Sequence, residues 1–191
     1  MVPYPFNKHL EPCSVVNEAM RNSGFMVRDC AYIDPFIYWR IEHRMSWRGA
    51  REACQQAKGG DLISIHSFNE KRVATALAQN NQVYGDGITN ADMGVWIGLI
   101  GIPQYATGAS NISHDRDWSW SDDSPLFYED WITGTDDSFP VYDDKEACAN
   151  IRSLIDWTQR TVAVGWAPAT CDIPMRAICK SPRHVLMPMG K

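Results

Sequence analysis

The spacing of apolar residues predicts two amphipathic helices in the first half of the chain. In the first helix the apolar positions are Trp47, Ala50, Cys54 and Ala57. They recur at helical intervals directly after Ser46, a residue type that commonly caps a helix, and Gly59-Gly60 then ends the pattern. One face of this helix is therefore expected to be buried.

The second helix is predicted from a capping sequence followed by a second apolar stripe. Ser67-Phe68-Asn69-Glu70 has the Ser-x-x-Glu form of a capping box, in which each side chain accepts a hydrogen bond from a free amide of the first turn. Val73, Ala74 and Leu77 then face inward, and the helix is expected to fray at Asn80-Asn81.

Short apolar runs rich in β-branched and aromatic residues predict six strands. The runs are FIYWRIE (36–42), LISI (62–65), VWIGLIGI (95–102), ACANI (147–151), VAVGW (162–166) and MRAICK (175–180). Between residues 103 and 144 the chain is polar but interrupted by tryptophans, so ordered loops anchored by aromatic side chains are expected there. Two early helices with several later strands predict an α+β domain.

Length and composition suit one domain with short appendages. The chain has 191 residues, 45% of them hydrophobic, which is enough for one substantial core. We expect a loosely structured arm or hairpin over residues 1–31, a folded domain over 32–180 and a flexible tail over 181–191. The net charge is −5 and the basic residues are scattered, so the sequence predicts no basic surface that would bind nucleic acid or an anionic membrane. No run of 18 apolar residues predicts a transmembrane segment.

The cysteines indicate disulfides and an oxidising compartment. They are Cys13, Cys30, Cys54, Cys148, Cys171 and Cys179. None is arranged as Cys-x-x-Cys, and no paired histidines accompany them at zinc-ligand spacing, so three disulfides are favoured over six buried thiols. Disulfides imply secretion, yet the first residues lack the pattern of a signal peptide, so we expect the leader to be missing from this chain. Asn111-Ile112-Ser113 is a glycosylation acceptor triplet and agrees with an extracellular location.

Nothing in the sequence indicates an enzyme. The five histidines are dispersed, and no Ser, His and Asp set is accompanied by a nucleophile elbow. No Gly-rich phosphate loop follows a predicted strand. Cysteines that form disulfides supply no thiolate nucleophile.

Four segments together resemble the C-type lectin-like domain. They are WRGAREACQQAKGGDLISIHSFNE, VWIGL, DWSWSDDSPLFYEDW and the closing EACANI…GWAPATCDIPMRAICK, within residues 38–180. Within that family the chain resembles secreted invertebrate members, including those of nematodes. The resemblance implies an α+β fold of two helices flanking short, mostly antiparallel sheets with a long irregular loop region. It also implies three disulfides, which are Cys54–Cys179, Cys148–Cys171 and Cys13–Cys30.

The resemblance also implies roles for the aromatic residues. Residues 96–99, Trp-Ile-Gly-Leu, would belong to the core. Trp118, Trp120 and Trp131 would pack the long loop against it, and Trp120 or Tyr128 stacking on a ligand is the alternative interpretation.

Sugar-binding members of the family hold one calcium ion that also binds two sugar hydroxyls. The ligands are a Glu-Pro-Asn or Gln-Pro-Asp triplet, a later Glu, and an Asn-Asp pair after the tryptophan of the last loop; calcium needs six to eight oxygens. Here Thr135, Asp136 and Asp137 stand at the triplet, so one carboxylate and the proline are missing. Asp137 could still coordinate an ion, and Glu146 matches the later Glu.

The last two ligand positions decide the calcium question. Ala167 and Pro168 follow Trp166 where Asn-Asp would stand, and they offer no side-chain oxygen. With two of the five expected ligands present, Asp137 and Glu146, we expect no cofactor, and no calcium at the family's sugar-binding site.

The sequence therefore favours a secreted recognition module that binds an extracellular protein or glycan without calcium, as a monomer or weak homodimer. The candidate ligand-binding residues are Thr135, Asp136, Asp137, Glu146, Trp166, Ala167 and Tyr128. One alternative is a divergent carbohydrate-binding lectin that uses the acidic loop around Asp143 and Asp144, with a weak cation site at Asp137 and Glu146. A second alternative is a structural or assembly protein.

Overall fold

The computed structural model describes residues 14, 16, 17, 20, 24–79, 94–103, 116–132, 146–155 and 161–186. The elements in these ranges are β1 (Val27–Ile33), β2 (Phe36–Met45), α2 (Trp47–Cys54), β3 (Asp61–Leu62), α3 (Phe68–Gln79), β4 (Gly94–Pro103), β5 (Arg116–Trp120), β6 (Ala147–Ile155), β7 (Thr161–Thr170), β8 (Met175–Pro182) and α5 (Arg183–Leu186). None of these helices has the length and apolar character needed to cross a membrane.

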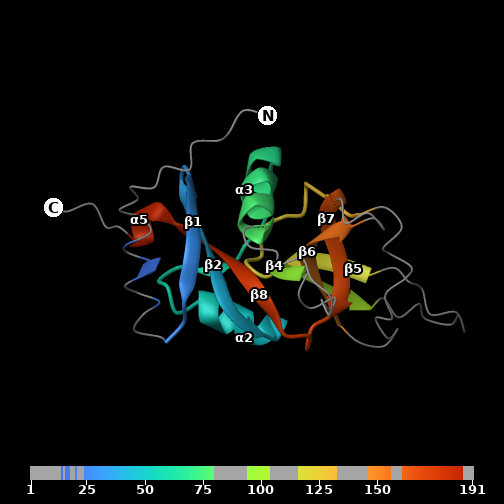
Figure 1. The fold of residues 1–191 in the computed structure, drawn as a ribbon, viewed down its shortest axis with the longest axis horizontal. Helices are drawn as coiled ribbons and strands as arrows, with labels where there is room; N and C mark the ends of the chain where they lie inside the picture. Colours follow the sequence, from blue (N-terminus) through green and yellow to red (C-terminus); the bar gives the residue numbers. More distant parts are fainter. Residues whose placement is uncertain are drawn as a thin grey trace, which may run out of the picture.

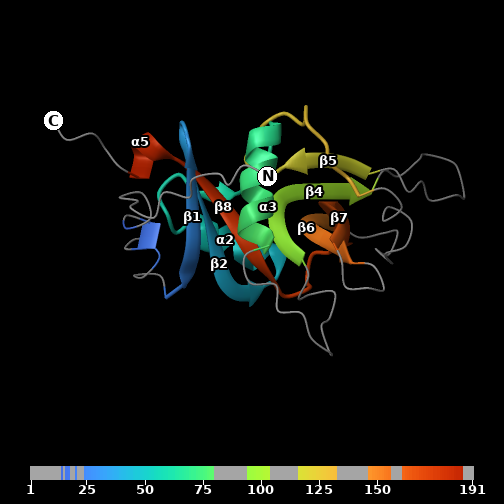
Figure 2. The same cartoon turned by 45° about the horizontal axis from the view of Figure 1, so that its top comes forward.

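The described strands form one mixed sheet with β8 and β4 at its centre. The order is β1-β2-β8-β4-β6-β7, with β3 paired to β8 and β5 paired to β4. Most neighbours are antiparallel, whereas β4 and β8 are parallel. Figures 1 and 2 show β5, β6 and β7 gathered at the end of the molecule opposite β1 and α5. The structure confirms the predicted α+β fold.

The two helices pack on opposite faces of the β2–β8 pair, as Figure 1 shows. Side chains alternate between the faces of a strand, and in β2 Ile37, Trp39 and Ile41 belong to the same core cluster as α2. Tyr38 points to the other face, where Val73 and Leu77 of α3 are buried. Because both faces are covered, β2 is buried without interruption from residue 37 to residue 41.

Helix α2 forms as its apolar spacing predicts. Ser46 caps it by accepting a hydrogen bond from the amide of Gly49 at 3.3 Å, and Trp47, Ala50 and Cys54 are buried. The indole of Trp47 donates to the carbonyl of Ile97 at 2.7 Å, which joins the helix to β4.

Helix α3 confirms the predicted apolar stripe and half of the predicted capping box. The hydroxyl of Ser67 accepts from the amide of Glu70 at 3.2 Å. The carboxylate of Glu70 accepts from the amide of His66 at 2.9 Å rather than from that of Ser67. Val73, Ala74 and Leu77 are buried. The expected fraying at Asn80 lies outside the described residues.

The strands differ from the prediction at several places. Residues 116–120, predicted to be loop, form β5 because they pair with β4, with Trp118 opposite Gly101. A side chain on Gly101 would stand 2.9 Å from the Trp118 ring, so only glycine allows this contact. Residues 27–31 were assigned to the arm but belong to β1, and the strand predicted at 62–65 is reduced to β3. The sheet also continues into Ser181 and Pro182, beyond the expected domain end.

Two of the predicted disulfides are confirmed. Cys54 of α2 is bonded to Cys179 of β8, and Cys148 of β6 is bonded to Cys171 just after β7. Cys30 is disulfide-bonded, and the predicted pairing with Cys13 involves a residue outside the described ranges.

Candidate functional site

The predicted ligand corner comprises Glu146, Trp166, Ala167 and Pro168 among the described residues. It lies at the antiparallel pair of strands β6 and β7. Ala149 pairs with Pro168 and Asn150 with Ala167, so the two residues after Trp166 are part of a regular strand. The side-chain amide of Asn150 donates through Nδ2 to the carbonyl of Ala167 at 2.8 Å. Ala167 and Pro168 are both buried. These two positions therefore present neither a side-chain oxygen nor an exposed side chain.

A proline fits this strand because β7 ends the sheet. Within the described ranges, only β6 and the isolated Trp131–Trp166 bridge pair with β7. Proline has no amide hydrogen, so in sheets it is confined to edge strands and irregular positions. Pro168 is thus compatible with the local backbone as well as unable to coordinate a metal.

Glu146, the family-like carboxylate before β6, is engaged by a cation of this chain. It forms an ion pair with Arg48 in the first turn of α2. The disulfide Cys148–Cys171 lies beside it, and the amide of Trp47 donates to the carbonyl of Cys171 at 2.8 Å. Both side chains of the ion pair are exposed, so the pair itself contributes little stability.

Trp166 is a structural residue at the centre of an aromatic cluster. It is fully buried, and its ring meets those of Trp120, Trp131 and Tyr128 at centroid distances of 5.4, 5.7 and 6.0 Å. Trp118 adds to the cluster through Trp131 at 4.7 Å. The rings hold the segment 118–132 against β7. Of the predicted aromatic candidates, only Tyr128 is partly exposed.

Several predicted site residues cannot be placed in this corner. Thr135, Asp136, Asp137 and Asn111 lie outside the described residues. Within the described part of the chain, no three His, Cys, Asp or Glu side chains come together in a way that could hold a metal ion. Glu146 lies just before β6, and Trp166 and Ala167 lie in β7, opposite Ile151 and Asn150 of β6.

A second cluster, which the sequence analysis missed, lies at the other end of the β2–β8 pair. The ammonium of Lys180 is buried and reaches the carboxylate of Glu70 at 2.7 Å and the carbonyl of Ser64 at 3.1 Å. The hydroxyl of Tyr38 donates to the same carboxylate at 2.8 Å. Burial, with the nearby charge of Glu70, raises the pKa of Tyr38, which keeps it a neutral donor.

The cluster continues into the turn after β5. The hydroxyl of Ser64 donates to the carboxylate of Asp122 at 2.6 Å, and Asp122 also accepts from the amide of Ser124 at 3.1 Å. The Ser124 hydroxyl lies 3.0 Å from Nε2 of His66. Burial and the charge of Lys180 lower the pKa of His66, so its ring is neutral near pH 7. The only sequence signal for this cluster is the Ser67-x-x-Glu70 box.

The family model described as a C-type lectin domain matches residues 43–181. The chain belongs to the C-type lectin-like domain family. It is 28% identical over 148 residues to human C-type mannose receptor 2, covering 77% of this chain but 8% of the receptor. It is also 29% identical over 148 residues to Struthiocalcin-2 of Struthio camelus, covering 77% of this chain and 89% of that one.

A solved C-type lectin domain shows the same fold. The domain of murine dendritic cell inhibitory receptor 2, determined in complex with N-glycan, has a TM-score of 0.55 and 23% identity over 81% of this chain and 97% of that one. The predicted fold family is thus confirmed. The resemblance to invertebrate members of the family stays a prediction.

Proposed function

We propose that this C-type lectin-like domain is an extracellular recognition module that binds a protein or glycan without the calcium–sugar chemistry of its sugar-binding relatives. The observation that carries the proposal is the buried Ala167-Pro168 pair in β7. These residues occupy the positions where the family resemblance requires the last two calcium ligands. A calcium site needs six to eight oxygens, and this corner lacks those of two side chains.

The ion pair at Glu146 supports the same proposal. A carboxylate that coordinates calcium must give up other cationic partners, and here Arg48 already neutralises it. Displacing the guanidinium from this exposed pair costs little, so the main obstacle is that calcium would have to find most of its ligands elsewhere. The two disulfides support an extracellular location, since such bonds persist in oxidising compartments.

Calcium titration tests the proposal directly. We expect no binding heat by isothermal calorimetry and the same melting temperature in 1 mM calcium and in EDTA. A site with a dissociation constant of about 10 μM would add about 2.7 kcal/mol at that concentration, or roughly 5–10 °C in a domain of this size. A shift of that size would overturn the proposal, and its loss in Glu146→Gln would place the ion at this corner.

A glycan array run with and without calcium extends the test to the ligand. Binding that is unchanged by EDTA agrees with the proposal, as does binding only to a protein partner. Retention on sugars that the chelator abolishes would instead support the divergent lectin that uses the acidic loop.

A further inference from the structure

A surface pocket of about 630 Å³ lies between β2, β8, the start of α3 and the segment after β5. Its apolar wall includes Phe36, Pro125 and Phe127, and its polar wall includes His66 and Asp122. This volume is within the range of pockets that enclose a small ligand or one long side chain. The buried cluster of Lys180, Glu70 and Ser64 lines the same pocket.

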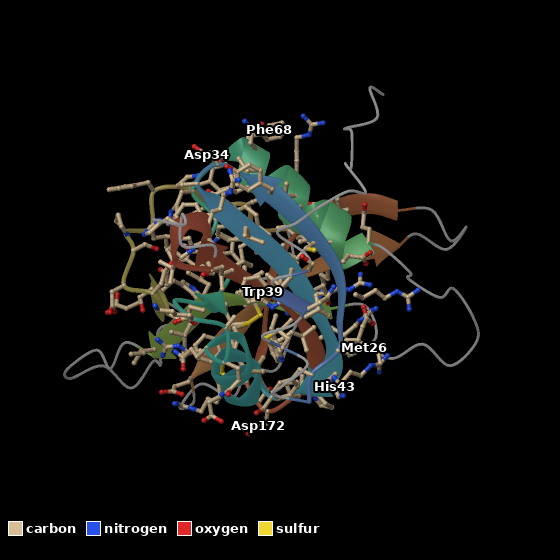
Figure 3. All side chains as sticks on the ribbon, turned by 90° about the vertical axis from the view of Figure 1, so that its left-hand side faces the viewer. Met26, Asp34, Trp39, His43, Phe68 and Asp172 are labelled. Atoms are coloured by element: carbon tan, nitrogen blue, oxygen red, sulfur yellow. A yellow bond between two sulfur atoms is a disulfide. The ribbon has the colours of Figure 1, made fainter. Side chains whose placement is uncertain are left out.

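The pocket is separate from the corner around Glu146. Strands β2 and β8 pair from Phe36↔Pro182 at one end to Met45↔Met175 at the other. The pocket lies at the Phe36 end, whereas Glu146 contacts Arg48, just beyond Met45. Figure 3 shows this separation, with Asp34 of the pocket rim and Asp172, beside Cys171, at opposite ends of the view.

The charges of the pocket do not balance within the described residues. Two of its carboxylates have cationic partners, since Glu70 pairs with Lys180 and Asp61 with Arg51. Asp122 and Asp34 also line the pocket, and neither forms an ion pair within the described ranges; their hydrogen bonds come from the hydroxyls of serine and tyrosine and an amide. The neutral ring of His66 adds no compensating charge, so the pocket carries excess negative charge.

Asp122 remains a carboxylate at neutral pH. Burial favours its neutral form, but hydrogen bonds from Ser124 and Ser64 and the nearby charge of Lys180 outweigh burial and lower its pKa. Asp122 is exposed and lines the pocket, so an incoming donor can reach it. A carboxylate has about four acceptor positions, and three serine hydrogen bonds leave room for another donor.

An exposed aromatic ring lines the same pocket as this carboxylate. Phe127 lines the pocket although it is 86% exposed, which is unusual for a phenylalanine that serves only the core. Phe68, adjacent to the lining residue Ser67, is 62% exposed, and Figure 3 shows it at the same end of the molecule as Asp34. Two exposed phenylalanines beside polar pocket residues offer apolar area that a partner protein can cover.

A pocket that holds both an exposed aromatic ring and a carboxylate has the groups that bind a planar cation. A guanidinium stacks on aromatic rings through its faces and donates to carboxylates through its edge. The same pocket already holds one cation against a ring, because the Lys180 ammonium lies 4.2 Å from the centroid of Phe36.

We propose that this pocket receives an arginine side chain of a partner protein, with the guanidinium bonded to Asp122 and stacked on Phe127. The inference rests on the proposed recognition function and names the surface and the chemistry that would carry it. The apolar rim would accommodate the partner's residues beside the arginine, and the corner at Ala167 would take no part.

The first test uses capped arginine as the probe. Nα-acetyl-arginine N-methylamide is titrated into the ¹⁵N-labelled domain in EDTA, with the citrulline analogue as its neutral, isosteric control. We expect saturable shifts of the amides of residues 122–124, 126 and 127 with a dissociation constant of about 1–10 mM, the weak end of the affinity scale. Citrulline should bind at least about tenfold more weakly, since it lacks the charge that Asp122 would neutralise.

Two adjacent variants provide a matched comparison. Asp122→Asn should weaken arginine binding about tenfold, whereas Asp123→Asn, which removes the same charge one residue away and outside the pocket lining, should not. Asparagine tolerates the φ of 59° at position 123, so the control keeps its backbone. Phe127→Ala, at an exposed position, should weaken binding several-fold without changing the melting temperature.

The inference is overturned if arginine gives no saturable shift, if citrulline binds equally well, or if both aspartate variants behave alike. Repeating the titration in calcium separates the two proposals. Calcium-induced shifts around Glu146 would refute the calcium-free function while leaving the arginine result to stand on its own.

Discussion

At the scale of single residues, one buried ion pair organises the polar end of the domain. Lys180 and Glu70 are both nearly excluded from solvent, and Tyr38 and the amide of His66 complete the shell of the carboxylate. Removing two charges from water carries a large desolvation cost. The attraction between the charges offsets this cost only when their remaining hydrogen bonds are also made. Removing one partner leaves the other charge buried and uncompensated.

We therefore predict that Glu70→Gln lowers the free energy of unfolding by about 3 kcal/mol. The reason is the ammonium of Lys180, which loses the one carboxylate that it contacts within the described ranges. Urea denaturation followed by circular dichroism measures the loss. Glu52→Gln on the exposed face of α2 removes the same charge and should change stability by less than about 0.5 kcal/mol.

Glu70→Gln should also make the free energy of unfolding depend less on pH in the acid range. Burial opposes the charge of Glu70, but hydrogen bonds from Lys180 and His66 outweigh it and hold its pKa below the ordinary value of 4.5. Stabilisation from this carboxylate is fully present above the ordinary pKa and is lost as the pH falls below 4.5 and through the lower native pKa. An equal pH slope in wild type and Glu70→Gln would contradict this account.

At the scale of elements, a close backbone approach joins the aromatic segment to β7. The amide of Trp166 donates to the carbonyl of Asp130 at 2.7 Å, and the amide of Ile132 donates to the carbonyl of Trp166 at 2.9 Å. Gly165 makes the approach possible, because a Cβ there would stand 2.6 Å from the Asp130 carbonyl oxygen. The indole cluster can form only if this glycine keeps the two segments together.

Gly165→Ala should consequently destabilise the domain by about 1–3 kcal/mol, since the obstructing atom belongs to the backbone and cannot rotate away. Thermal unfolding measures the change. Gly49→Ala is the matched substitution in α2, where the nearest atom is the Ser46 hydroxyl at 3.3 Å. Helix propensity favours alanine by up to about 1 kcal/mol, so Gly49→Ala should be neutral or stabilising.

Elements with a strong apolar period could be predicted from the sequence, whereas those made by pairing could not. Helix α2 and strand β2 follow directly from the spacing of Trp47, Ala50 and Cys54 and from the run that begins at Phe36. Strand β5 is short and lies within a polar stretch of the sequence, and it forms because β4 supplies a pairing partner. Nothing local in its five residues distinguishes them from an ordered loop.

The two candidate sites differ in the same way. The corner at Ala167 could be predicted because the family resemblance fixes which positions should carry oxygen. The arginine pocket could not, since its walls come from four segments far apart in sequence, around residues 36, 66, 122 and 180. Only the folded sheet brings these side chains to one place.

At the scale of the whole molecule, the two described disulfides restrain chain segments of very different length. Cys54–Cys179 spans 125 residues and joins α2 to the central strand β8, whereas Cys148–Cys171 spans 23 and closes the β6–β7 pair. In the chain-entropy description, a longer closed segment removes more freedom from the unfolded state.

We predict that Cys54→Ala/Cys179→Ala costs about 5 kcal/mol and Cys148→Ala/Cys171→Ala about 3 kcal/mol. The ordering is the sharper test, and chemical denaturation of the two double variants measures it. An equal loss would show that packing around the sulfurs, rather than restraint of the unfolded chain, sets the contribution of each bond.

The indole cluster around Trp166 gives this domain a built-in optical signal. Four tryptophan rings held at fixed mutual angles should dominate the near-ultraviolet circular dichroism, whereas the sheet and helices determine the far-ultraviolet spectrum. Following both wavelengths through one denaturant ramp would show whether the segment 118–132 detaches before the backbone unfolds. A ligand that binds beside Phe127, within the same segment, should then change the near-ultraviolet spectrum without any added dye.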